Sequence, residues 1–220
     1  MTADGASGVR SLDDETQGIT SRPDWHLLRN ARLESVVTSP DAFLAYAAQL
    51  EAKPLEYWQE EIRSSTWVVV QGGNKILGIA AAKPPGGMDN YAHPEEACFI
   101  ESVWIAPSMR RSGVGERLVT YLIEERRKVG IQRFYLWVID HNIPAIDLYD
   151  RTGFKRTGRS GPLPARQGRE IQYLLAFDSD VIDDYELERN VHARELDRKR
   201  FGITYRLLGS AADQGSLARS

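Results

Sequence analysis

One stretch decides the fold, and it reads CFIESVWIAPSMRRSGVG over residues Cys98–Gly115. Its first half is rich in β-branched and aromatic residues, which is typical of a strand. Pro107 ends that strand, because proline cannot donate a hydrogen bond to a sheet ladder. A short basic loop with two glycines follows, and apolar residues then recur at helical spacing. The stretch therefore predicts a strand, a loop suited to an anion, and a helix.

The loop is the first candidate for chemistry. A helix N-terminus carries unpaired N–H groups and a partial positive charge. Gly113 and Gly115 have no Cβ, so a phosphate can approach the backbone closely, and Arg110 and Arg111 add positive charge. These features predict a phosphate or pyrophosphate site, and a plain turn with solvated arginines is the alternative.

Two segments carry a family resemblance. Arg110–Gly115 resembles the pyrophosphate loop of the GNAT superfamily of acetyl-CoA-dependent N-acyltransferases, whose pattern is Arg/Gln-x-x-Gly-x-Gly/Ala between a strand and a helix. Asn142–Phe154 matches a second signature of that family, Asn-x-x-Ala-x-x-Leu-Tyr-x-x-x-Gly-Phe. Two patterns at the family's spacing are more specific than either alone. The resemblance covers roughly residues 24–177.

The resemblance implies the GNAT fold, of class α/β (α+β). We expect a central, mixed, mostly antiparallel twisted sheet of about six or seven strands, flanked by helices. Helices are expected near residues 24–39, 41–50, 54–62, 114–129 and 142–153, and strands near 66–71, 75–82, 95–106, 133–140, 154–159 and 170–177. The family opens with a short strand, for which residues 18–22 are a poor candidate.

Three segments are expected along the chain. Residues 1–21 predict a flexible N-terminal tail, residues 22–178 the acetyltransferase domain, and residues 179–220 a charged, partly helical C-terminal extension outside the family's common core. The mixed charges of the extension are typical of a solvated face. Packing on a second subunit is the alternative, so a homodimer is left open.

Composition excludes several classes of protein. The formal net charge of −3 gives no global basic field for nucleic acid. The single cysteine, Cys98, excludes an internal disulfide framework and fits a reducing compartment, so the cytoplasm is expected. No apolar run approaches the roughly eighteen residues of a membrane span. No Cys, His or carboxylate spacing predicts a metal site.

Acetyl transfer to an amine needs a base for the amine proton, a hydrogen-bond donor for the developing oxyanion, and an acid for the leaving thiolate. Glu101 lies on the predicted central strand, where regular alternation places residues 101, 103 and 105 on one face. We expect its carboxylate to accept the amine proton, and binding the acceptor or a structural role are the alternatives. Tyr149 matches the family tyrosine whose hydroxyl acts as general acid on the coenzyme sulfur, and core packing is the alternative.

The resemblance implies acetyl-CoA as the acyl donor. Backbone groups of Val103 and Ile105 are expected to bind the pantetheine arm, and Asn142 to contact the coenzyme while capping its helix. The residues expected to bind the coenzyme are Val103, Trp104, Ile105, Arg110, Arg111, Ser112, Gly113, Val114, Gly115, Glu116, Asn142 and Tyr149.

The expected function is N-acetylation of a primary amine by direct attack on acetyl-CoA in a ternary complex. A coenzyme A-binding sensor without catalysis and an acyltransferase for another acyl-CoA are the alternatives. The acceptor, a small molecule or a protein lysine, has no readable code in the loops over residues 84–94 and 160–169.

Overall fold

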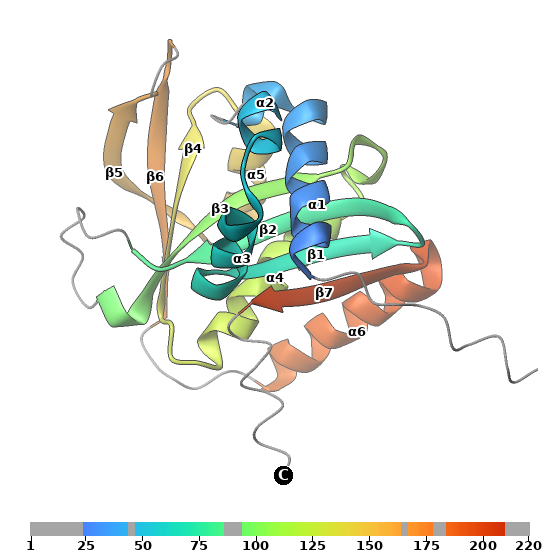
Figure 1. Ribbon diagram of the computed structural model, residues 1–220. Coiled ribbons are helices and arrows are strands. Elements are labelled where there is room, and N and C mark those ends of the chain that lie inside the picture. Colours follow the sequence, from blue (N-terminus) through green and yellow to red (C-terminus); the bar gives the residue numbers. More distant parts are fainter. Residues whose placement is uncertain (1–23, 44–46, 86–93, 164–166, 178–183, 210–220) are drawn as a thin grey trace, which may run out of the picture.

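The computed structural model describes residues 24–43, 47–85, 94–163, 167–177 and 184–209. Its centre is a seven-stranded sheet in the order β5-β6-β4-β3-β2-β1-β7 (Figure 1). The strands are β1 Thr66–Gly72, β2 Lys75–Lys83, β3 Ala97–Ile105, β4 Arg133–Ile139, β5 Lys155–Pro162, β6 Arg169–Ala176 and β7 Ile203–Gly209. Neighbouring strands run antiparallel except β3 and β4, which are parallel. The expected mixed, mostly antiparallel sheet is confirmed.

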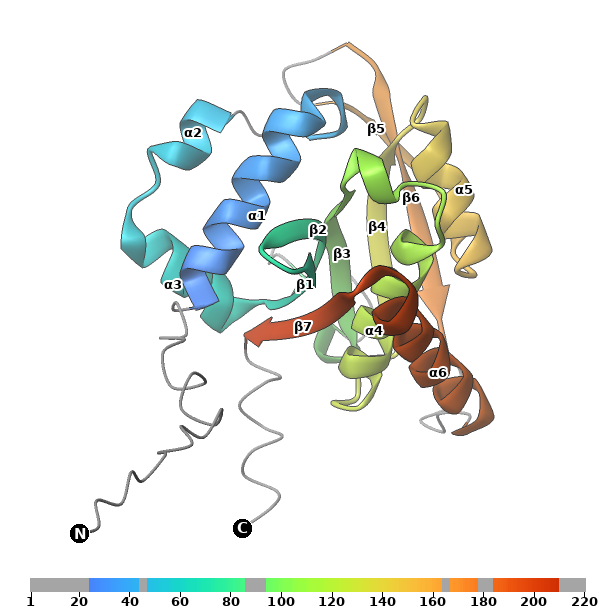
Figure 2. The same cartoon turned by 90° about the vertical axis from the view of Figure 1, so that its right-hand side faces the viewer.

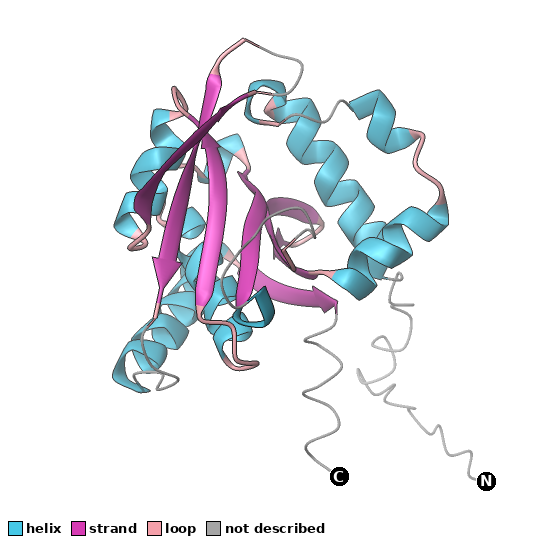
Figure 3. Cartoon of the chain, turned by 90° about the vertical axis from the view of Figure 1, so that its left-hand side faces the viewer, coloured by secondary structure: helices cyan, strands magenta, loops and turns pink. Residues whose placement is uncertain are grey.

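Helices cover both faces of this sheet. On one face lie α1 Asp24–Thr38, α2 Ala47–Glu51 and α3 Leu55–Ser64, and on the other α4 Val114–Arg127, α5 Ile143–Arg151 and α6 Asp184–Phe201 (Figures 2 and 3). Short 3₁₀ turns occur at Pro40–Ala42, Pro94–Glu96 and Pro107–Met109. Within the described ranges, every helix is too short or too polar to cross a bilayer.

Two apolar cores, one on each face, hold the layers together. The α1-side core consists of Leu28, Ala31, Val36, Leu50, Trp58, Trp67, Val69, Ile79, Ala81, Trp104, Ala106 and Leu208. The α4-side core consists of Val68, Val70, Ala80, Ala82, Cys98, Ile100, Val114, Leu118, Val119, Leu122, Ile123, Ile131, Phe134, Leu136, Val138, Ile146, Tyr149, Phe154, Tyr173 and Ile203. Strand residues alternate between the cores because successive side chains point to opposite faces.

One expected helix differs in the structure. Residues 41–50 do not form a single helix, because the backbone of Phe43 is extended, with φ −124° and ψ 145°. The 3₁₀ turn Pro40–Ala42 precedes it, and α2 begins only at Ala47. The guanidinium of Arg32 lies 5.6 Å from the centre of the Phe43 ring. The extended residue Phe43, which interrupts the expected helix, therefore packs its ring against Arg32. The apolar spacing of the segment does not indicate this interruption.

The C-terminal strand β7 was not predicted from the sequence. It pairs antiparallel with β1 along its whole length, from Ile203 opposite Gly72 to Gly209 opposite Thr66. Helix α6 packs on α4 and leads into β7, so residues 184–209 belong to the helical layer and the sheet. The opening strand expected near residues 18–22 lies outside the described residues. The division into a domain over 22–178 and an extension over 179–220 stays a prediction.

Candidate active site

The parallel pair β3 and β4 is joined only at its beginning. Residues 97–99 pair with residues 133–135, and the ladder ends at Phe99 and Tyr135. Beyond that point β3 continues along β2, and β4 continues along β6. Main-chain groups in the second halves of β3 and β4 are therefore not used in a ladder between these two strands, and they can serve a ligand. The loops leading to α4 and α5 begin at this end.

A β-bulge interrupts β3 in the same region. Ser102 has a positive φ of 58°, which is uncommon for a residue with a side chain. On β2 the register steps from Ala81 to Ile79, while on β3 it steps from Glu101 to Trp104. The extra residue on β3 is the mark of a bulge, and bulges re-aim the side chains that follow them.

The bulge corrects one expectation from the sequence. Regular alternation would place Glu101, Val103 and Ile105 on one face of the sheet. Because of the bulge, Glu101 shares its face with Trp104 on the α1 side, whereas Val103 and Ile105 pack against the α4-side core. The side chain of Glu101 therefore lies on the opposite face of the sheet from Val103 and Ile105.

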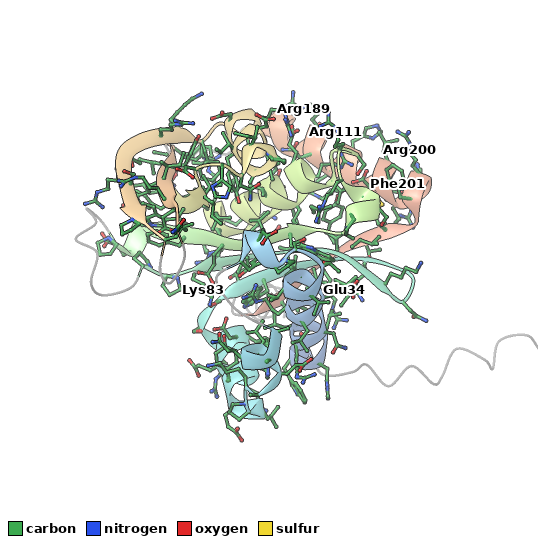
Figure 4. The ribbon with its side chains drawn as sticks, turned by 90° about the horizontal axis from the view of Figure 1, so that it is seen from above. Glu34, Lys83, Arg111, Arg189, Arg200 and Phe201 are labelled. Atoms are coloured by element: carbon green, nitrogen blue, oxygen red, sulfur yellow. The ribbon has the colours of Figure 1, made fainter. Side chains whose placement is uncertain are left out.

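Glu101 belongs to a small charged network on the α1 side. Lys83 Nζ lies 2.9 Å from Glu101 Oε1 and 2.8 Å from Glu61 Oε2 on α3. Burial acts to lower the pKa of Lys83, but the charge of Glu101 and hydrogen bonds to both carboxylates outweigh it, so that pKa is raised. The Glu101 side chain is 45% exposed to solvent. Figure 4 shows Lys83 on the side of the sheet that carries α1 to α3.

An open cavity of about 650 Å³ lies among the helices on this same side. It is lined by Arg32, Gln49, Leu50, Ala52, Lys53, Pro54 and Tyr57. Burial lowers the pKa of Arg32, and the charge of Glu101 opposes that shift. Arg32 therefore joins the cavity to the surroundings of Glu101. On α3, Trp58 is buried in the α1-side core, and Tyr57 packs against that core and also lines the cavity.

The loop Arg110–Gly115 leads from the 3₁₀ turn after β3 into α4. Arg111 and Gly113 have positive φ angles of 60° and 84°. Ser112 Oγ donates to the carbonyl of Met109 at 2.6 Å, which fixes the middle of the loop. A Cβ on Gly115 would lie 3.3 Å from Ile105 Cγ1, so glycine allows α4 to approach β3 closely.

The two arginines of the loop have different surroundings. Arg110 donates from Nε to the carbonyl of Ile105 at 3.1 Å and from Nη2 to Ser39 Oγ at 2.8 Å. Ser39 Oγ also accepts a hydrogen bond from the Trp104 indole at 3.2 Å. Arg110 therefore ties the loop to β3 and to the end of α1, while Arg111 is exposed.

Helix α5 and its cap carry the next two predicted site residues, Asn142 and Tyr149. Asn142 caps this helix, since its Oδ1 accepts a hydrogen bond from the N–H of Ala145 at 3.4 Å. Tyr149 lies in the α4-side core, with its ring centre 5.8 Å from that of Phe154, and burial raises its pKa. The hydroxyl therefore stays protonated at neutral pH and can donate a hydrogen bond to an acceptor such as a thiolate. Glu116, also expected at the site, lies 3.5 Å from Arg151 Nε.

The structure brings most of the predicted site residues together on the α4 side. The α4 residue Gly115 faces Ile105 of β3 and Leu148 of α5, so the loop, the end of β3 and α5 meet. Glu101 lies on the other face, and Trp104 turns its indole toward α1. Trp104 can therefore serve a ligand on the α4 side only through its main chain.

Sequence reasoning missed several charged groups around this site. Lys83 and Arg32 come next to Glu101 through strand register and helix packing, which leave no local pattern. Arg117 stands four residues after Gly113, one helical turn further, and that spacing alone could have indicated it. Among the described residues, no group of three or more His, Cys, Asp or Glu is placed to hold a metal ion. The expectation of no metal stays a prediction.

Comparison with curated proteins gives relatives of one kind. Streptothricin acetyltransferase of Streptomyces lavendulae is 29% identical over 118 residues, which are 52% of this chain and 59% of that protein. The chloroplastic GCN5-related N-acetyltransferase 6 of Arabidopsis thaliana is 33% identical over 160 residues, 72% of this chain and 46% of that protein. The chain thus spans about half the length of these relatives.

Solved structures share the fold. The Salmonella typhimurium protein yncA, solved with its cofactor acetyl-CoA, superposes with a TM-score of 0.53 at 18% identity, covering 73% of this chain and 92% of that one. The ribosomal-protein-alanine N-acetyltransferase of Brucella melitensis gives a TM-score of 0.54 at 18% identity, covering 70% and 94%. The model of the acetyltransferase (GNAT) family matches residues 25–154, which is more than half of the chain. The chain therefore belongs to the GNAT family of acetyltransferases.

Proposed function

We propose that this protein transfers an acetyl group from acetyl-CoA to a primary amine by direct attack in a ternary complex. One observation carries the proposal. The glycine loop at the N-terminus of α4 opens beside Ile105, at the end of the half of β3 that does not pair with β4. A nucleotide-linked thioester bound at the loop could extend its arm along the half of β3 that does not pair with β4, and present its carbonyl to the α1 side.

The coenzyme end of the site uses main-chain donors. The helix N-terminus and the left-handed conformations at Arg111 and Gly113 direct N–H groups toward an anion. Arg111, exposed at the loop, adds a charge for the pyrophosphate. Backbone groups of Val103 and Ile105 bind the amides of the pantetheine arm, and an N–H of this strand polarises the thioester carbonyl.

The chemical step moves one proton on each side of the sheet. The neutral amine attacks the thioester carbonyl, and the C–S bond breaks as the new C–N bond forms. Glu101, held by Lys83, accepts the proton that the amine loses, directly or through water. On the other side, the Tyr149 hydroxyl hydrogen-bonds to the sulfur and passes its proton to it as the C–S bond breaks, so that the coenzyme leaves as the thiol. Tyr149 then regains a proton from water.

The acceptor belongs on the α1 side. Glu101, the Lys83 network and the cavity that Arg32 and Tyr57 line all lie there. The names of the relatives point to two kinds of acceptor, since one acts on streptothricin and an Escherichia coli relative on the alanine of ribosomal protein bS18. The latter is 34% identical over 77 residues, 34% of this chain and 52% of that protein.

The test is a panel of amines with acetyl-CoA as donor. The panel contains streptothricin, an alanine-starting peptide of bS18, polyamines, free amino acids and lysine peptides. Release of free thiol and the acetylated product, measured together, should depend on both substrates. Coenzyme binding without acetylation of any amine would contradict the proposal and favour a sensor. Turnover with succinyl-CoA but not acetyl-CoA would instead reveal a different acyl donor.

A further inference from the structure

Helix α6 carries a buried carboxylate that binds the first turn of α4. Asp197 is only 4% exposed, and its two oxygens accept hydrogen bonds from Nε and Nη2 of Arg117, the latter at 2.6 Å. Tyr205 of β7 donates its hydroxyl to the same carboxylate at 2.5 Å. Asp197 and Arg117 are 80 residues apart in the sequence. A buried carboxylate without such partners would lower the stability of the fold, because its charge would be unpaired. Asp197 finds its partners because α6 packs on α4 and on β7.

Arg117 passes this contact on to the loop Arg110–Gly115. Its Nη2 also donates to the carbonyl of Ser112 at 3.1 Å. Its Nη1 lies so close to Gly113 that a Cβ at that position would collide with it. A continuous chain of contacts therefore runs from Tyr205 through Asp197 and Arg117 to the two central residues of the loop.

The loop needs such support because of its backbone. Arg111 and Gly113, on either side of Ser112, both have left-handed φ angles, which are unfavourable for a residue like arginine unless the surroundings fix them. The Ser112 carbonyl is held by Arg117, and its hydroxyl is bonded to the carbonyl of Met109. Release of the guanidinium would leave the conformation between Arg111 and Gly113 without one of its two anchors.

We propose that Asp197 is a positioning residue for the coenzyme. By fixing the Arg117 guanidinium against Ser112 and Gly113, it holds the loop in the conformation that binds a pyrophosphate. This inference rests on the proposed function, since it assumes that coenzyme A binds at the loop. It gives the C-terminal α6–β7 unit a role in the binding of the coenzyme. Figure 4 shows Arg111 of the loop and Phe201 at the end of α6 on the same side of the sheet.

Whether replacing Asp197 weakens or tightens coenzyme binding separates two explanations. A carboxylate near a pyrophosphate should repel it, so loss of that charge alone would tighten binding. If Asp197 acts through the position of Arg117, its replacement should weaken binding instead. The two views therefore predict changes in opposite directions for the same substitution.

The structure offers a matched control in the same interface. Glu124 of α4 is 7% exposed and accepts hydrogen bonds from Asn190 at 2.7 Å and from Arg194 at 2.9 Å, both on α6. It lies seven residues after Arg117, about 10 Å further along the helix. Glu124→Gln therefore weakens a comparable buried contact between α4 and α6 at a distance from the loop.

The experiment compares Asp197→Asn and Glu124→Gln in the full chain. Calorimetry measures the Kd for coenzyme A and for pantetheine, which lacks the pyrophosphate, and thermal unfolding measures stability. We expect Asp197→Asn to raise the Kd for coenzyme A by about fivefold or more and to leave that for pantetheine unchanged. Glu124→Gln should leave both Kd values unchanged even where it lowers the unfolding temperature as much.

A double-mutant cycle tests the route through Arg117. If Asp197 acts through it, Arg117→Met and the double variant Arg117→Met with Asp197→Asn should raise the Kd for coenzyme A equally. Additive losses would overturn that route. Unchanged or tighter coenzyme binding in Asp197→Asn, or an equal loss in Glu124→Gln, would overturn the inference. The proposed function would then still stand as long as the wild type binds coenzyme A and acetylates an amine of the panel. Wild-type protein that binds no coenzyme A would overturn both.

Discussion

The two faces of the sheet hold their key carboxylates in different ways. On the α1 side, Glu101 is 45% exposed and pairs with Lys83 beside an open cavity. On the α4 side, the Asp197 side chain is 5% exposed and shares its hydrogen bonds between Arg117 and Tyr205. An accessible carboxylate can exchange a proton with a substrate, whereas an enclosed and fully bonded one can only hold its neighbours. The sheet thus separates the proposed acceptance of the amine proton by Glu101 from the support of the coenzyme loop.

The sharpest test of the α1 side is the replacement of Glu101, the proposed base. If Glu101 accepts the amine proton, Glu101→Gln should lower kcat/KM by about a hundredfold near neutral pH, where a general base contributes most. The defect should shrink as the pH rises toward about 10.4 for a lysine-like acceptor, because the neutral amine is then abundant. The measurement is a pH profile of kcat/KM for wild type and variant with one good acceptor.

The alternative role for Glu101 gives a different profile. A residue that only grips the acceptor should raise its KM by a similar factor at every pH. A defect of constant size across pH would therefore assign Glu101 to acceptor binding and remove it as the base.

Replacing Tyr149 tests the role proposed for the α4 side in cleavage of the C–S bond. A hydrogen bond to a charged group contributes about 2 kcal/mol, so Tyr149→Phe should lower kcat by about 30-fold. The Kd for coenzyme A should stay the same, because the bond forms only as thiolate charge develops. Equal turnover of variant and wild type, with chemistry shown to limit the rate, would exclude Tyr149 as the acid.

The next test of the α4 side changes the coenzyme loop, Arg110–Gly115. Gly113→Asp adds a negative charge and a Cβ that collides with Arg117 at a φ of 84°. The Kd for coenzyme A should rise at least about tenfold, or roughly 1.4 kcal/mol. Gly158→Asp is the control, since Gly158 has a φ of 86° with nothing within 4 Å of an added Cβ. Unchanged calorimetric affinity in folded Gly113→Asp would remove the loop from the coenzyme site.

Local patterns explain why the loop and α5 could be predicted. Arg110–Gly115 and Asn142–Phe154 encode their own turn, cap and helix, so a short window carries the information. The α/β class followed from the family resemblance that these two segments carry. Most strands and helices of residues 54–177 lie within a few residues of their expected bounds.

Long-range pairing explains what could not be predicted. β7 has a mixed burial pattern and becomes a strand by pairing with β1, more than 120 residues earlier in the chain. The bulge at Ser102 has no glycine to announce it, and it moved Glu101 to the other face. The Asp197–Arg117 pair depends on how α6 lies on α4, so the charged C-terminal segment resembled an ordinary solvated face.

Lys83 gives the smallest expected effect, which concerns the stability of the open face. Its pKa is raised in the folded protein by Glu101 and Glu61, so its pairing stabilises the fold fully below the unfolded-state pKa of about 10.4. That contribution should be lost as the pH rises through the higher folded-state pKa. Since ion pairs that solvent still reaches contribute little, Lys83→Met should cost about 1 kcal/mol at pH 7.

The measurement is urea unfolding of wild type and Lys83→Met between pH 7 and pH 12. The difference between their free energies of unfolding should be constant up to about pH 10 and fall above it. Lys75→Met, at the exposed start of the same strand, corrects for the general loss of lysine charge. A difference that persists at pH 12 would mean that Lys83 acts through its packing against Trp67, 5.6 Å from the ring centre, and not through its charge. The Lys83 ammonium would then contribute no measurable electrostatic stability beside Glu101, and the two faces would differ in burial alone.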